Sequence, residues 1–211
     1  MRPTLVSILV LLIGLGYSVV RYVALGPVNV DQIPAYISNK ALSLAGLILI
    51  AMSLSARMLS QRIGGLRFLR EDRKSLGMIG LGMTGVHALL SLMLLNRTYF
   101  TKFYDTASGL MTWQAELSML AGAAGMAMLI WQSQINGSQT PGTGWGASSR
   151  RRRIGLVVLA LTFIHVAAMG YAGWLVPGTW HGSLPPITLL SAIIAGLAII
   201  VVAIPRKDDK P

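Results

Sequence analysis

Long uninterrupted apolar runs, separated by short polar stretches, dominate the sequence. The apolar positions are continuous and do not alternate with polar ones, which favours helices over strands. Each run is close to the roughly 20 residues that an α-helix needs to cross a bilayer. The six predicted helices cover Thr4–Leu25, Ala41–Gln61, Ser75–Asn96, Gly109–Gln132, Ile154–Val176 and Ile187–Ile204. The pattern predicts an all-α integral membrane bundle, with residues 1–211 forming a single transmembrane domain.

Two stretches outside this regular pattern need an interpretation of their own. The longest polar connection, Ser133–Ser149, contains mainly Gln, Gly, Ser and Thr, and we expect a mobile loop there. The first apolar run, from about Leu5 to Leu25, is long for a signal peptide and is followed by no convincing small-residue cleavage site. We therefore expect this run to be retained as the first helix.

Composition agrees with a membrane location and narrows the chemistry. Hydrophobic residues make up 54% of the chain and charged residues 12%, against about 25% charged in soluble domains. The chain has no cysteine, which excludes disulfides, iron–sulfur clusters and thiolate metal sites.

The net charge is +11, and the basic residues lie between the apolar runs. This placement is typical of loops that meet anionic lipid, so we expect no nucleic acid partner. One predicted side receives Arg2, Arg57, Arg62, Arg67, Arg70, Arg73, Lys74, Arg150–Arg153, Arg206, Lys207 and Lys210, and the other Arg21, Lys40, Arg97 and Lys102. Because basic residues favour the cytoplasmic side, both termini are predicted to be cytoplasmic in a multi-pass protein of the inner (plasma) membrane.

Polar side chains inside predicted spans mark candidate functional positions, because they are costly in hydrocarbon. His87 lies 12 residues into the third helix and His165 lies 11 residues into the fifth, and both helices enter from the cytoplasmic side. A rise of 1.5 Å per residue puts them ~18 and ~16 Å deep, at nearly equal depth. Two imidazoles at one depth predict bis-histidine ligation of a haem iron, with His87 and His165 as both cofactor-binding and metal-ligating residues.

Two further features leave alternatives open. Four glycines precede His87, at Gly77, Gly80, Gly82 and Gly85, and either let a porphyrin approach the backbone or serve helix packing. Glu116, about 10 Å into the fourth helix, is a candidate proton- or quinone-binding group, a partner for a basic side chain, or a residue that reaches the headgroups. His181, beside Trp180 in an outer loop, reads as an interfacial residue.

The run Arg73-Lys74-Ser75-Leu76-Gly77, followed ten residues later by His87, resembles the third helix of the ferric reductase-like transmembrane family. Within that family the chain is most similar to the haem-binding membrane subunit of the periplasmic methionine sulfoxide reductase system. The basic run Arg150–Arg153 followed by His165 matches the family's fifth helix, and the resemblance covers roughly 39–176. It implies a b-type haem protein that transfers electrons.

The sequence departs from this family at the inner half of the bundle. The family commonly carries a further histidine 13 or 14 residues before the one in the fifth helix, and counting back from His165 reaches Arg152 and Arg151. Counting back 14 from His87 reaches Arg73. The resemblance therefore implies one haem b, with a quinone, a flavin or a partner subunit as a further carrier.

Three functions compete at this point. The first is an electron-transfer subunit that passes electrons from a membrane or cytoplasmic donor toward an outer-side acceptor, with no catalytic residue of its own. The second is a non-catalytic structural subunit of a larger membrane complex that has lost some or all haem sites. The third, a small transporter or channel, predicts paired intramembrane charges or broken helices, and apart from Glu116 the sequence offers neither.

Overall fold

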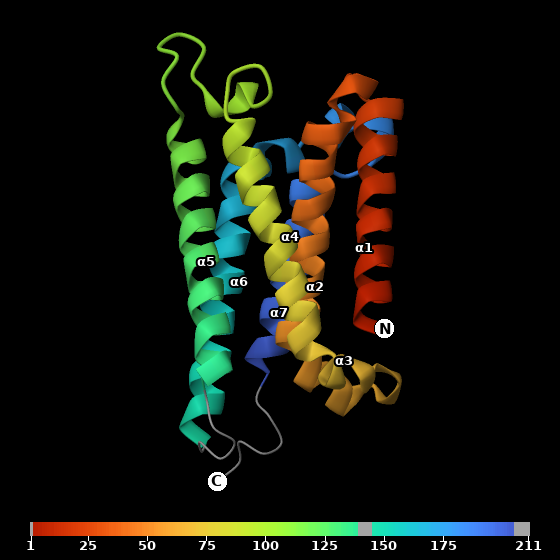
Figure 1. Cartoon of the computed structure of the whole chain (residues 1–211). Helices are drawn as coiled ribbons and strands as arrows, with labels where there is room; N and C mark the ends of the chain where they lie inside the picture. Colours follow the sequence, from red (N-terminus) through yellow and green to blue (C-terminus); the bar gives the residue numbers. More distant parts are fainter. Residues whose placement is uncertain (1, 139–144, 205–211) are drawn as a thin grey trace.

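Six long helices, running alternately up and down, build the part of the chain that the computed structural model describes, residues 2–138 and 145–204 (Figure 1). Within it the regular structure is helical apart from one isolated bridge, so the prediction of an all-α fold is confirmed there. The helices are α1 (Arg2–Val19), α2 (Ser38–Arg62), the short α3 (Phe68–Glu71), α4 (Arg73–Met93), α5 (Trp113–Ser138), α6 (Trp145–Trp174) and α7 (Ile187–Ala203).

Five helical stretches among the described residues are long and apolar enough to cross a membrane. They are Arg2–Ala24, Val30–Arg62, Arg73–Met93, Arg150–Trp174 and His181–Ala203. The α5 helix is long enough, with 26 residues, but glycines, alanines and the polar Gln114, Glu116 and Gln132 lower its hydropathy. A multi-pass membrane protein is therefore supported, and a sixth crossing by α5 stays a prediction.

The helix boundaries differ most from the predicted ones around the longest connection. The predicted loop over Ser133–Ser149 is wrong at both ends, because 133–138 continue α5 and 145–149 begin α6, and residues 139–144 lie outside the described part. Extending an existing helix by one residue adds a hydrogen bond and needs no new nucleus, so polar residues can continue it. The sequence pattern also missed α3 and the π-helical turn Ile33–Ile37 before α2, and it predicted Val20–Ala24 as helix without indicating that this turn is π-helical.

The helices pack in two groups, with α1 and α4 against α2, and α5 and α7 against α6. Contact between α2 and α7 joins the groups, whereas α4 and α5 meet only over a short stretch. Glycine permits the closest approach within the first group. A Cβ atom on Gly46 would lie 2.6 Å from Thr84 Oγ1 and 3.2 Å from the Gly80 carbonyl oxygen. Small residues bring membrane helices into such contact.

The two ends of the bundle differ in chemistry. The beginning of α1, the short α3 and the end of α7 lie at the same end (Figure 1). The connection between α2 and α4 and the beginning of α6 bring most of the described basic residues to this end, which we call the basic end. The loop between α4 and α5 lies at the opposite end, which we call the outer end after the predicted topology (Figure 1). The sequence predicts that both termini are cytoplasmic, so it predicts that the basic end faces the cytoplasm.

Arg21 is a basic residue at the outer end that does not face solvent. Only 4% of its surface is exposed, and its Nη1 donates hydrogen bonds to the carbonyl oxygens of Leu184 and, at 3.3 Å, His181. The π-helical turn after α1 therefore ties the first helix to the loop before α7. This structural role explains why an arginine lies on the side with few basic residues.

Candidate functional site

His87 lies on α4, six residues before the helix ends at Met93, and its imidazole is held by α2. Its Nδ1 lies 2.7 Å from Oδ1 of Asn39, a side chain only 3% exposed. Asn39 is itself fixed, because its Nδ2 donates to Ser91 Oγ at 3.0 Å. Since Asn39 Oδ1 can only accept, Nδ1 of His87 carries the proton and Nε2 keeps its lone pair.

His165 lies on α6, nine residues before Trp174, and its imidazole is held by α5 in the same manner. Its Nδ1 lies 2.8 Å from the backbone carbonyl oxygen of Ser118. The Ser118 hydroxyl donates to the backbone carbonyl of His165 at 2.7 Å, so its proton is already used. Nδ1 of His165 is therefore the donor to the Ser118 carbonyl, and Nε2 again keeps its lone pair.

The hydrogen bond of His165 depends on a glycine one helical turn further along α5. A Cβ atom on Gly122 would lie 2.8 Å from His165 Nδ1 and 3.1 Å from Cε1. Because residues four apart share a helix face, Gly122 leaves the space through which the imidazole reaches Ser118.

The imidazoles of His87 and His165 belong to different helix groups, one on α4 and the other on α6. The two residues also lie in the halves of α4 and α6 that point to the outer end. All hydrogen bonds of the two rings among the described residues are made by Nδ1. The arrangement supplies two nitrogen lone pairs, each on a ring that a buried partner orients.

The number of ligands limits the kind of metal that such a pair can hold. In the described part of the chain, no three His, Asp or Glu side chains come together. Protein sites for a bare zinc ion generally supply three or four ligands. A haem iron needs fewer, because the porphyrin supplies four nitrogens and the protein only the axial ligands. Two oriented imidazoles without a third ligand therefore fit a haem better than a bare ion.

The glycines before His87 divide into two kinds. Gly77 and Gly80 face α2, where an added Cβ would lie 2.7 Å from Ser53 Oγ and 3.0 Å from Leu49 Cβ, so these two serve helix packing. A Cβ on Gly85 would meet only the terminal carbon of Met126, at 3.4 Å, and one on Gly82 would meet nothing within 4 Å. Only Gly82 and Gly85 leave space beside α4.

The other two polar candidates lie at the periphery. Glu116 is exposed in the first turn of α5, where the helix dipole stabilises a negative charge. His181 lies in the short turn before α7, and its backbone carbonyl accepts a hydrogen bond from Arg21. Neither residue has a described contact with His87 or His165.

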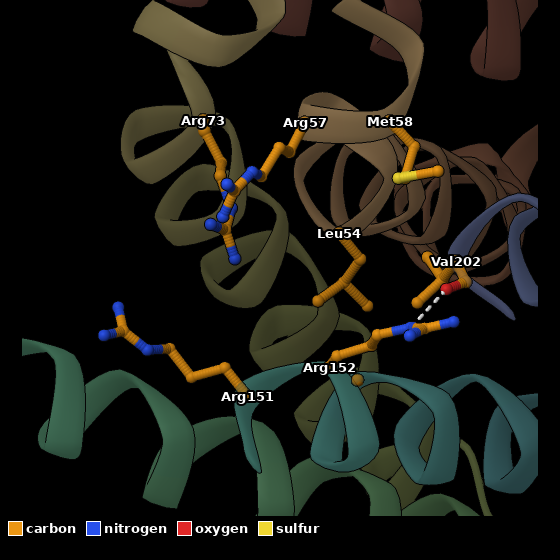
Figure 2. Close-up of a pocket in the computed structure, with 8 residues that line it drawn as sticks. Leu54, Arg57, Met58, Arg73, Arg151, Arg152 and Val202 are labelled. Atoms are coloured by element: carbon orange, nitrogen blue, oxygen red, sulfur yellow. Dashed lines mark hydrogen bonds between the residues drawn. The ribbon is translucent and has the colours of Figure 1, made fainter. Parts of the chain in front are cut away.

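A cavity of about 170 Å³ lies at the basic end, away from the histidines (Figure 2). Four arginines line it, namely Arg57, Arg73, Arg151 and Arg152, together with Leu54, Met58, Gly155 and Val202. Arg73, Arg151 and Arg152 are the positions that the family resemblance compares with further histidines. In this chain they surround a cationic cavity.

Sequence reasoning missed the two residues that orient the imidazoles. Asn39 lies just before the predicted second helix, and Ser118 lies two residues after Glu116. Both are buried, at 3% and 2% exposure. The only signal for Asn39 in the sequence was a polar residue at the start of an apolar run. Its contact with His87 depends on how the helices pack, which the sequence does not show.

No protein-family model matches the chain, and no curated protein matches it significantly in sequence.

Proposed function

We propose that the protein is a b-type haem-binding membrane electron-transfer subunit, with His87 and His165 as the axial ligands of one haem. In this proposal all six long helices cross the inner membrane, and the basic end faces the cytoplasm. The resemblance to the ferric reductase-like family, and to its methionine sulfoxide reductase branch, points to the same function.

One observation carries the proposal, namely the matched orientation of the two imidazoles. Each Nδ1 donates to a buried oxygen, Asn39 Oδ1 at 2.7 Å and the Ser118 carbonyl at 2.8 Å. Metal-ligating histidines almost always donate their second ring N–H to such a partner, which fixes the tautomer and raises the basicity of the ligand. Neither Nε2 has a hydrogen-bond partner among the described residues, so both lone pairs stay available to a metal ion.

The chain's own residues would hold the cofactor and set its properties. A bound haem supplies one-electron chemistry, which no side chain of this cysteine-free protein provides. Asn39 and Ser118 would orient the two ligands through their hydrogen bonds to Nδ1. Because both histidines lie toward the outer end, the acceptor is expected on that side. A quinone, a flavin or a protein partner would supply the electron across the basic half.

The test is the visible spectrum of the full-length protein, produced with added haem precursor and purified in mild detergent. The proposal expects a sharp α-band on reduction with dithionite, and about one haem per chain by pyridine haemochrome assay. A colourless protein would contradict the proposal. The second function, a structural subunit of a larger membrane complex, would then take its place, since the basic half already carries arginines at the positions compared with histidines.

A further inference from the structure

The two candidate haem ligands differ in the group that holds Nδ1. The partner of His165 is the backbone carbonyl of Ser118, whereas the partner of His87 is the side-chain amide of Asn39. A backbone carbonyl can only accept a hydrogen bond, and its helix fixes its direction. A side-chain amide carries an acceptor and a donor at its two tips. The two imidazoles are therefore held by groups of different chemistry.

The hydrogen bonds around His87 can be reversed without losing one. In the described arrangement, Nδ1 donates to Asn39 Oδ1 at 2.7 Å, and Asn39 Nδ2 donates to Ser91 Oγ at 3.0 Å. A half-turn of the amide exchanges Oδ1 and Nδ2 and leaves the outline of the side chain unchanged. Asn39 Nδ2 then donates to Nδ1, and the Ser91 hydroxyl donates to Oδ1. Both arrangements contain two hydrogen bonds among the same three side chains.

The reversed arrangement changes which nitrogen of His87 can bind a metal. Because Nδ1 then accepts a hydrogen bond, the single proton of the neutral imidazole lies on Nε2. One proton leaves Nδ1 and one reaches Nε2, so the charge of the ring is unchanged. A protonated Nε2 has no lone pair to give to iron. The orientation of the Asn39 amide therefore selects between a ligating and a non-ligating form of His87.

His165 has no equivalent second arrangement. Ser118 Oγ lies 3.1 Å from Nδ1, within donating distance. Donation there would give up two shorter hydrogen bonds, from Nδ1 to the Ser118 carbonyl at 2.8 Å and from the Ser118 hydroxyl to the His165 carbonyl at 2.7 Å. Because Ser118 is buried, exchanging two hydrogen bonds for one longer bond is unfavourable. Ser118 therefore keeps His165 in its ligating tautomer.

We propose that His87 is the exchangeable axial ligand of the haem, and that a small neutral molecule of the carbon monoxide type binds the iron in its place. The inference rests on the proposed function, because it needs a haem held by His87 and His165. Once His87 has left the iron, the reversed arrangement keeps both of its hydrogen bonds but leaves no lone pair on Nε2. His165 has no such form and stays bound. The environment of the vacated axial position then determines which ligand enters.

The first experiment determines the tautomers of the histidines in the haem-free protein. Nitrogen NMR spectra of the full-length chain in detergent, with isotope-labelled histidine, separate the two tautomers of each ring. Signals are assigned by their loss in His87→Gly and His165→Gly. We expect the Nδ1–H tautomer alone for His165 and both tautomers for His87. The Nδ1–H tautomer alone at His87 would overturn the proposal without any haem.

The second experiment titrates carbon monoxide into the dithionite-reduced, haem-loaded protein. The infrared frequency of the bound carbon monoxide should match that in His87→Gly and differ from that in His165→Gly. Asn39→Asp supplies a carboxylate that only accepts, so it should lower the apparent affinity for carbon monoxide at least about tenfold. Ser43→Ala is the control on the same helix and should keep the native affinity.

The outcomes separate this inference from the proposed function. A sharp α-band that carbon monoxide leaves unchanged would overturn the inference and still support haem binding. A frequency that matches His165→Gly, or equal affinities in Asn39→Asp and Ser43→Ala, would also overturn it. A colourless protein would contradict the proposed function and this inference together. The nitrogen spectra and the titration of the unaltered protein do not depend on the folding of Asn39→Asp.

Discussion

Gly122 of α5 lies directly against the imidazole of His165, so that a Cβ atom there would be 2.8 Å from Nδ1. Gly122→Ala should therefore push the ring away from the Ser118 carbonyl. We expect a loss of about 1–3 kcal/mol in unfolding free energy and weaker haem binding. Thermal unfolding in detergent and haem content measure the two effects.

Gly125→Ala is the matched control on the same helix. Its Cβ would lie 3.6 Å from Leu161 Cβ, an ordinary contact, and alanine favours helix by up to about 1 kcal/mol. This variant should keep its haem and its stability. If both substitutions have the same effect, the imidazole of His165 does not occupy the described position.

Replacing Asn39 tests whether His87 is a metal ligand or only a structural residue. Asn39→Leu removes the acceptor of the His87 Nδ1 proton, which lies 2.7 Å away. Loss of such a partner lowers metal affinity by roughly 10- to 100-fold. It also makes the imidazole a weaker donor to ferric iron, so the midpoint potential of any haem that remains should rise.

Potentiometric titration measures the change in midpoint potential of Asn39→Leu, with Ser43→Ala as the control. Ser43 lies one turn further along α2, and its hydroxyl donates to the Lys40 carbonyl without contacting either histidine. An unchanged potential in Asn39→Leu would contradict the assigned role of the Asn39–His87 hydrogen bond.

The contact between α2 and α4 predicts opposite effects for two nearby glycines. Gly80→Ala would place a Cβ 3.0 Å from Leu49 Cβ and 3.1 Å from the Gly46 carbonyl oxygen, and should destabilise the protein by about 1–3 kcal/mol. Gly82→Ala meets nothing within 4 Å and should be neutral or stabilising. Melting temperatures compare the two variants, and equal losses would show that α2 and α4 do not meet at Gly80.

The apolar pattern predicted the helical architecture, but not how the side chains of His87 and His165 are held. Apolar runs and basic clusters are local properties, and they located most helix ends within a few residues. The partner of each imidazole depends on helix rotation and packing, which no periodicity in the sequence reveals. The loop predicted between α5 and α6 was mostly helical because polar composition does not by itself end a helix that is already formed.

The loop at the outer end should respond to acid. Backbone and side-chain hydrogen bonds from Ser108, at 2.7 and 2.8 Å, lower the pKa of Asp105 below its ordinary range. A lowered pKa means that the ionised form stabilises the folded loop. This contribution is present above the unfolded-state pKa of about 4 and is lost as pH falls through the lower folded value.

Hydrogen-exchange protection of the Ser108 and Gly109 amides, corrected for intrinsic exchange rates, should therefore fall on acidification. Asp105→Ala should show the low protection already at neutral pH. Protection that is independent of both pH and the substitution would contradict the role of Asp105.

The most direct test of the central claim uses the three histidines of the chain, one at a time. We would replace His87, His165 and His181 by glycine and record the reduced visible spectrum of each purified variant. The account predicts that His87→Gly and His165→Gly lose the sharp α-band and regain it when imidazole is added, while His181→Gly keeps the native spectrum. An unchanged α-band in His87→Gly or His165→Gly would contradict bis-histidine haem ligation.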